Sequence, residues 1–152
     1  MQVRAAYLSH AEPSVRDPMD YNPEFSRRAR GFAIYAALRA LGRRGVADLV
    51  DRCCELAVRF GEQLSTADGA ELLLPVSLNQ VVVRFLAADG DHDRHTRSGL
   101  AAVQREGVCW PSSTTWRGQA AIRISVCNAT TDLDDVDASV ASLLRWHHQL
   151  NP

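Results

Sequence analysis

The first half of the chain carries two stretches of helical periodicity. From Phe25 to Leu41, apolar residues recur every three or four positions and many are alanines, which predicts a helix that another helix can approach closely. Gly42 and Gly45 interrupt this pattern, as glycine often does at helix C-termini. A second stripe of period 3.6 then predicts a helix from Val46 to about Leu64.

Beyond residue 65 the pattern changes to short strands alternating with helices. Runs rich in β-branched residues predict strands at 71–76, 80–86, 108–110 and 120–127, with a loop at 111–118. A helical pattern covers His92–Glu106 and stops at Gly107. A final helix is predicted after Thr131, which together with Asp134 resembles a capping box. Expected on the buried faces of these two helices are His95, Gly99, Ala102, Val103, Leu133, Val136, Val140, Leu143, Leu144 and His147.

This order of elements predicts an α+β fold, with a small sheet and helices on one of its faces. Residues 1–24 contain three prolines and no clear element, so we expect a loop there. We expect 25–64 to form connecting helices and 65–152 to form the α+β domain. No apolar run is long enough to span a membrane.

Composition and charge narrow the chemistry. With 46% hydrophobic residues and a formal net charge of -1, the chain can bury a core, and it has no global field to attract nucleic acid or anionic lipid. The N-terminus lacks a secretory pattern, so a cytoplasmic location is expected. All 17 basic residues are arginine, so the chain has no side-chain amine for a Schiff base. Cys53, Cys54, Cys109 and Cys127 are expected to be buried or semi-buried free thiols.

Two segments carry a resemblance to a known family. The stretch beginning Tyr21–Asn22–Pro23–Glu24–Phe25–Ser26–Arg27–Arg28 and ending Leu41–Gly42–Arg43–Arg44–Gly45 resembles the segment after the catalytic core of group II pyridoxal-phosphate (PLP) decarboxylases. Trp110–Pro111, Ile122–Asn128 and the acidic start of the last helix are also similar to that family, so the resemblance extends from about Tyr7 to Trp146. These enzymes act on aromatic amino acids, glutamate and related substrates.

The resemblance implies the C-terminal portion of a fold-type-I PLP enzyme. Residues 1–24 would then be a remnant of the large PLP-binding domain, followed by a long helix at its boundary and a small, mostly antiparallel C-terminal domain. The lysine, histidine and aspartate that hold the cofactor lie upstream in the family, so Met1 is expected to mark a truncated product or part of a split gene. The full-length protein would be a homodimer that binds PLP and a small amino acid, whereas this chain would self-associate, hold no PLP covalently and be inactive alone.

The resemblance also implies three site residues. Tyr7, in a Tyr–Leu pair, falls where the family carries a proton donor on a mobile loop; the alternative is a tail residue without that role. Ser26 and Arg27 match the position that reaches the PLP phosphate of the partner subunit. A helix start beside them would favour an anion, although Ser26 could be an ordinary N-cap. Arg27 and Arg28 could orient that loop or form a solvated basic face.

The other candidate residues favour structural roles. Arg123, within a predicted strand, is expected to be a salt-bridged structural arginine rather than a carboxylate ligand. His92 and His95 lack a third ligand, and the acidic stretch 132–137 lacks the glycine of a calcium loop, so no metal is expected. His147 and His148 are expected at a frayed helix end.

Two other functions stay open at this point. One is a fragment of a fold-type-I aminotransferase or other PLP lyase, which only the sequence around an upstream lysine would distinguish. The other is a free-standing, non-catalytic α+β module that binds a protein or ligand.

Overall fold

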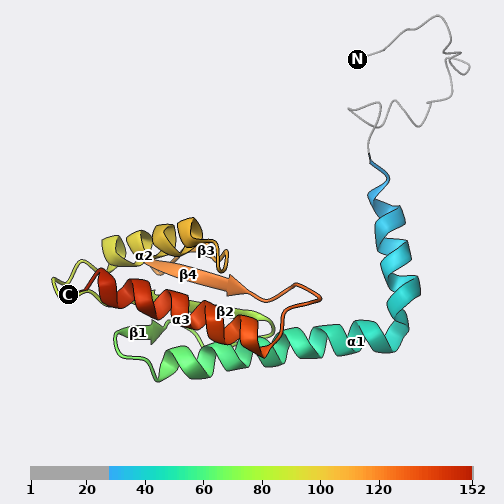
Figure 1. Cartoon of the computed structure of the whole chain (residues 1–152), viewed down its shortest axis with the longest axis horizontal. Helices are drawn as coiled ribbons and strands as arrows, with labels where there is room; N and C mark the ends of the chain where they lie inside the picture. The colour runs from blue at the N-terminus through green and yellow to red at the C-terminus, as the bar shows by residue number, and fades with distance from the viewer. Residues whose placement is uncertain (1–27, 152) are drawn as a thin grey trace, which may run out of the picture. The chain divides into compact units, whose positions relative to one another are not determined.

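The computed structural model describes residues 28–151, and the chain divides at Gly42 into two units, 1–42 and 43–152. The helices and the four-stranded antiparallel sheet confirm the predicted α+β class. In chain order, the elements in Figure 1 are α1 (Arg30–Ser65), β1 (Ala70–Leu72), β2 (Gln80–Phe85), α2 (His92–Glu106), β3 (Ser112–Trp116), β4 (Gln119–Ser125) and α3 (Leu133–Gln149).

The break predicted at Gly42 is present within α1. Gly42 has φ 63° and ψ -177°, a backbone conformation that is essentially restricted to glycine. Two predicted bounds are wrong. The helix begins at Arg30 rather than Phe25, and it resumes directly after Gly42 rather than at Val46. Gly45 lies inside the helix, because a glycine there lowers helix stability by only about 1 kcal/mol and the packed turns that follow can offset this.

The core of the second unit lies between the sheet and its three helices. The strand order is β1-β2-β4-β3, and antiparallel pairing places Val81 opposite Ile124 and Val83 opposite Ile122. These four side chains are buried on one face of the sheet, and Arg123, which points the other way, is exposed. The same cluster includes buried residues from every helix: Cys53, Leu56, Ala57, Phe60 and Leu64 of α1, Leu100 and Val103 of α2, and Val136, Val140 and Leu143 of α3.

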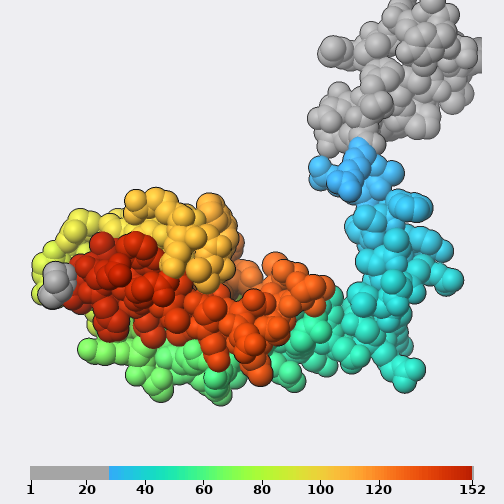
Figure 2. Space-filling view, viewed as in Figure 1, coloured from blue at the N-terminus to red at the C-terminus, as the bar shows by residue number. Residues whose placement is uncertain are grey.

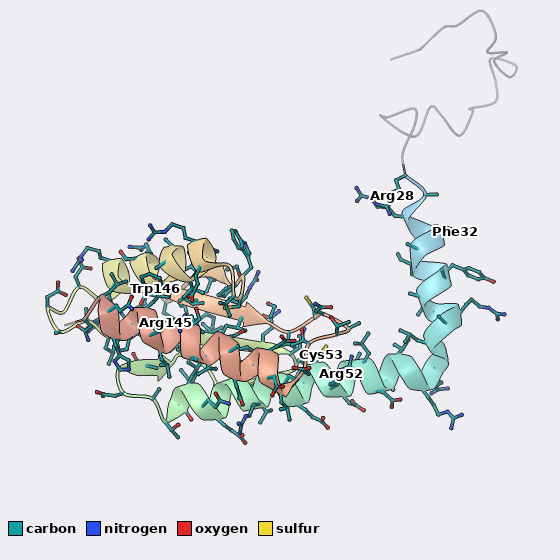
Figure 3. All side chains as sticks on the ribbon, viewed as in Figure 1. Arg28, Phe32, Arg52, Cys53, Arg145 and Trp146 are labelled. Carbon is teal, nitrogen blue, oxygen red and sulfur yellow. The ribbon has the colours of Figure 1, made fainter. Side chains whose placement is uncertain are left out.

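Helices α1 and α3 run side by side along this unit (Figures 1 and 2). Asp137 of α3 accepts hydrogen bonds from Arg59 and Gln63 of α1. Arg52, labelled on α1 in Figure 3, donates to the backbone carbonyl of Ala129 in the loop after β4. The exposed polar contacts thus align two helices whose apolar faces share one core.

The N-terminal turns of α2 are tied to the ends of β2 and β4. The Thr96 hydroxyl bonds both the backbone N–H and the carbonyl of Phe85, at 3.1 and 3.2 Å. The Asp93 carboxylate accepts from the backbone N–H of Ala120 at 3.0 Å. The β2–β4 ladder ends at the Val83–Ile122 pair. Beyond it, the side chains of Thr96 and Asp93 provide hydrogen-bond partners for the backbone groups of Phe85 and Ala120, because buried backbone groups need a partner.

The predicted strands need two corrections. β1 covers Ala70–Leu72 only, and residues 108–110 form no strand, whereas Ser112–Trp116, predicted as a loop, is β3. This strand is polar because it lies at the edge of the sheet, where edge strands tolerate exposed side chains. A two-residue turn with positive φ at Arg117 and Gly118 joins it to β4. Hydrophobic patterning cannot detect such a strand.

The helix ends follow local sequence closely. The predicted bounds of α2 are confirmed, and Gly107 caps it in the left-handed conformation with φ 82°. α3 begins with a capping box between Asp132 and Asp135, one residue later than the Thr131–Asp134 pair predicted. Leu133, predicted to be buried, is consequently exposed in the first turn, whereas Val136 and Leu143 are buried as expected.

Candidate functional site

The three predicted site residues, Tyr7, Ser26 and Arg27, lie outside the described residues. Their nearest described neighbour is Arg28, which is exposed and labelled in Figure 3. Because α1 begins at Arg30, the unpaired N–H groups of its first turn start four residues after Ser26. Ser26 itself is outside the described residues, so its predicted place at a helix start and its phosphate role stay predictions that the family resemblance implies.

The second unit contains a cavity of about 400 Å³ at the end of β4. Its walls come from four places: the strand end and loop at 124–128, the segment 108–111, the first turns of α3, and Phe60 of α1. Ser112 of β3 pairs with Arg123 of β4 at the open end of the hairpin. The segments 108–111 and 124–128 continue from this paired end, and each forms one wall of the cavity. Sequence patterning missed this cavity because segments distant in the chain form it.

Half of the residues that line the cavity carry polar side chains: Cys109, Ser125, Cys127, Asn128, Thr131, Asp135 and Ser139. Burial raises the pKa of the Cys109 thiol, and a hydrogen bond with Ser139 opposes this only in part, so Cys109 is a protonated thiol near neutral pH and a weak nucleophile. The Asp135 carboxylate belongs to the capping box of α3. No arginine or histidine is among the lining residues, so an anion would find no counter-charge there. The lining combines apolar side chains with neutral polar groups and one carboxylate.

The buried arginine of the domain is Arg84, and the prediction for Arg123 is wrong. Arg123 is exposed, and its Nε donates to the Ser112 hydroxyl at 3.2 Å. Arg84 on β2 is only 7% exposed and lies 3.3 Å from the Asp93 carboxylate. The Arg84 Nε is the one buried side-chain nitrogen or oxygen without a hydrogen-bond partner in the described part of the chain. In the sequence, the sign of this burial is that Arg84 directly follows three consecutive valines, 81–83.

Two histidines form a buried pair that the sequence did not predict. His95 Nε2 lies 2.8 Å from His147 Nδ1, and each residue is 4% exposed. His147 was expected both on the apolar face of α3 and at a frayed end; the burial is confirmed and the fraying is wrong. His148 is exposed. Within residues 28–151 no group of three or more histidine, cysteine, aspartate or glutamate side chains gathers in a way that could hold a metal ion.

The cysteines match their expected state except at one position. All four are free; Cys53 is buried, Cys54 and Cys109 are partly buried, and Cys127 is exposed. Cys127 lies just beyond β4, where the chain turns outward into the loop before α3. Among the helices described, none is both long and apolar enough to cross a membrane.

Comparison with known proteins places this fold in a family. A model of the pyridoxal-dependent decarboxylase conserved domain matches residues 1–86, which is more than half of the chain. The chain belongs to the pyridoxal-dependent decarboxylase family. L-2,4-diaminobutyrate decarboxylase of Rhizobium meliloti (strain 1021) is 24% identical over 156 residues, covering 95% of this chain and 32% of that protein. The chain thus spans about a third of the length of this decarboxylase.

Solved structures of similar proteins share the fold. Oryza sativa TDC with PLP and tryptamine aligns with a TM-score of 0.76 at 17% identity, covering 90% of this chain and 30% of that one. Catharanthus roseus tryptophan decarboxylase in complex with L-tryptophan aligns with a TM-score of 0.71 at 16% identity, covering 81% and 27%. These alignments confirm the predicted α+β region of a fold-type-I decarboxylase.

The cavity near β4 does not fit PLP, the cofactor that this decarboxylase family implies. The whole chain lacks lysine, so no side chain can form a Schiff base with the cofactor's aldehyde. The lining residues of the cavity offer no cation for a phosphate group.

Proposed function

We propose that this chain is the C-terminal part of a PLP-dependent amino acid decarboxylase and is inactive alone. The observation that carries the proposal is the family match over residues 1–86 in a chain that has no lysine. The alignments support it, because each covers most of this chain but only about a third of its relative. The complete protein would be a cytoplasmic homodimer acting on a small amino acid.

In the complete protein we assign this chain a supporting role. PLP, when bound, withdraws electrons from the substrate carbon as carbon dioxide leaves. Ser26 and Arg27 would donate hydrogen bonds to the cofactor phosphate of the partner subunit, which needs cationic or N–H donors. Tyr7 would hold a proton on a mobile loop as a general acid. The domain from Arg43 onward would provide the packed scaffold beside them.

Cofactor trapping tests the proposal. We expect the purified chain mixed with PLP to show no absorbance band of a protein-bound imine and to release no carbon dioxide from a panel of L-amino acids. Borohydride should trap no side-chain adduct by mass spectrometry, once the α-amine of Met1 is blocked. Co-expression with any reading frame that lies upstream and encodes the lysine-bearing domain should restore both the band and the activity.

Two results would contradict the proposal. Stoichiometric PLP retention or decarboxylation by the chain alone would show that it forms its own site. Conversely, an upstream region without any PLP-binding domain, together with a stable monomeric chain, would favour a free-standing non-catalytic module.

A further inference from the structure

The buried histidine pair joins three elements at one end of the second unit. His95 comes from the first turn of α2 and His147 from the last turns of α3, and their ring nitrogens are 2.8 Å apart. The His147 ring also stacks on Phe85 of β2, with ring centroids 5.0 Å apart. At Gly69, just before β1, a Cβ would lie 2.4 Å from His147 Nε2, so only glycine lets the ring fit.

The contact between the two rings needs one donor and one acceptor. Of the facing nitrogens, His95 Nε2 and His147 Nδ1, one carries a proton and donates it, and the other accepts with its lone pair. We propose that the His95–His147 pair is a pH-sensitive latch, which holds the C-terminal end of α3 while one ring can accept and releases it when both are protonated.

The geometry makes the second proton decisive. A proton on the outer nitrogen of the donor ring leaves its N–H donor intact, so the bond between the rings survives. A further proton on the accepting nitrogen would place two N–H groups and two positive charges at the 2.8 Å contact. Because both rings are buried, solvent cannot screen that repulsion, and α3 must move away.

Burial, and after it the surrounding charges, favour the neutral pair. Burial is the main cause that lowers the pKa of His95, with Arg94 and His92 adding to it and Asp89 opposing it. Burial also lowers the pKa of His147, with His95 and His148 adding to it and Asp68 opposing it. Folding is therefore stabilised fully above the ordinary histidine pKa of 6.5, and this contribution is lost as the pH falls from there toward the lowered folded values.

Release of α3 would also break the hydrogen bonds that Asn151 forms near the C-terminal end of the chain. The Asn151 side chain accepts from the backbone N–H of Ala88 at 2.7 Å and donates to the carbonyl of Leu86 at 3.4 Å. These contacts attach the end of the chain to the loop between β2 and α2. Since Asn151 follows α3 directly, they depend on the same helix end that the pair holds.

Unfolding of the full chain in urea at pH 7.5 and pH 5.5 tests the latch. The unfolding equilibrium constant of the parent should rise on acidification more than that of His95→Gln, whose amide keeps a donor that cannot titrate. The difference should approach about tenfold per pH unit for each proton that the parent's pair takes up. His148→Gln removes an exposed neighbour whose effect on His147 is smaller than that of burial, so it should change the pH dependence less than His95→Gln does. Equal pH dependence of the parent and His95→Gln would overturn the proposal.

Imidazole NMR of the parent decides the matter if His95→Gln does not fold. We expect one hydrogen-bonded ring N–H between His95 and His147 at pH 7.5, and loss of amide protection at Ala88 and Leu150 together with the second protonation. Two fully cationic rings with both amides still protected would also overturn the latch.

Discussion

Two helical glycines with opposite surroundings show how single residues set the packing. At Gly61 of α1, an added Cβ would lie 2.3 Å from Cγ2 of Val76, in the segment after β1. At Gly99 of α2, nothing lies within 4 Å of that position. Glycine is therefore required sterically at the first site and only weakens the helix at the second.

Alanine substitution should separate these two roles. We expect Gly61→Ala to lower the free energy of unfolding by about 1–3 kcal/mol, because Val76 or α1 must shift in a packed core. Gly99→Ala should raise it by about 0.4–1 kcal/mol, since alanine restricts the unfolded chain without a clash. Urea unfolding of both variants provides the measurement. Equal stabilisation by both would mean that α1 does not approach Val76 closely.

Among the elements, α2 and α3 are joined at their C-terminal ends by Glu106. Its carboxylate accepts from the Ser142 hydroxyl and the Trp146 indole, each at 2.7 Å, and from Arg145. Trp146 and Arg145 are labelled on α3 in Figure 3. Hydrogen bonds from Ser142 and then Trp146 are the main causes that lower the pKa of Glu106 below its ordinary value of 4.5.

The carboxylate should therefore stabilise the domain in a pH-dependent way. A lowered folded pKa means that this stabilisation is present above about pH 4.5 and is lost as the pH falls through the folded value. We expect Glu106→Gln to lower the thermal midpoint at pH 7, and the gap from the parent to shrink in acid. The exposed Glu55→Gln provides the control. A constant gap at every pH would rule out the charge as the cause.

For the whole molecule, the N-terminal part of α1 offers the clearest surface for association. Five large apolar residues there are between 45% and 76% exposed: Phe32, Ile34, Tyr35, Leu38 and Leu41. So many exposed large apolar side chains on one short helical segment mark this patch as a surface for association. In a complete decarboxylase we expect this patch to be covered by the large domain or by a partner subunit.

The chain alone should consequently self-associate through this patch. We expect the parent to form dimers or larger species as its concentration rises in analytical ultracentrifugation. The double substitution Ile34→Glu and Leu38→Glu should shift it to monomer by placing charge in the interface. Leu133→Glu, at another exposed leucine, should leave association unchanged. A parent that stays monomeric at high concentration would contradict the prediction.

Two substitutions in the complete protein separate cofactor binding from proton transfer. Ser26→Ala should weaken PLP retention about ten- to a hundredfold, since a lost charge-assisted hydrogen bond is worth roughly 1.5–3 kcal/mol. Tyr7→Phe should retain PLP but release less of the normal amine, because it removes only the proton donor. Rates of PLP dissociation and product ratios test both. Unchanged retention in Ser26→Ala would remove its phosphate role, and unchanged products in Tyr7→Phe would reduce Tyr7 to a linker residue.

The sequence by itself determined the elements that local physics controls. The period of apolar residues located α2 and the second half of α1, and Gly42 and Gly107 marked breaks because their backbone conformations exclude most other residues. The absence of lysine excluded a Schiff base between PLP and any side chain, because no other residue type carries a side-chain primary amine. The family resemblance, carried by residues 21–45, was confirmed by the match over 1–86.

The tertiary structure alone decided what depends on contacts between distant segments. The polar strand β3 exists because β4 supplies its partners, and polar residues at a sheet edge carry no hydrophobic signal. The Arg84–Asp93 pair and the cavity beside Cys109 likewise join parts that sequence spacing cannot bring together. The His95–His147 pair shows the reason most clearly: each residue suits the apolar face of a helix, and only the packing of α2 against α3 makes them partners.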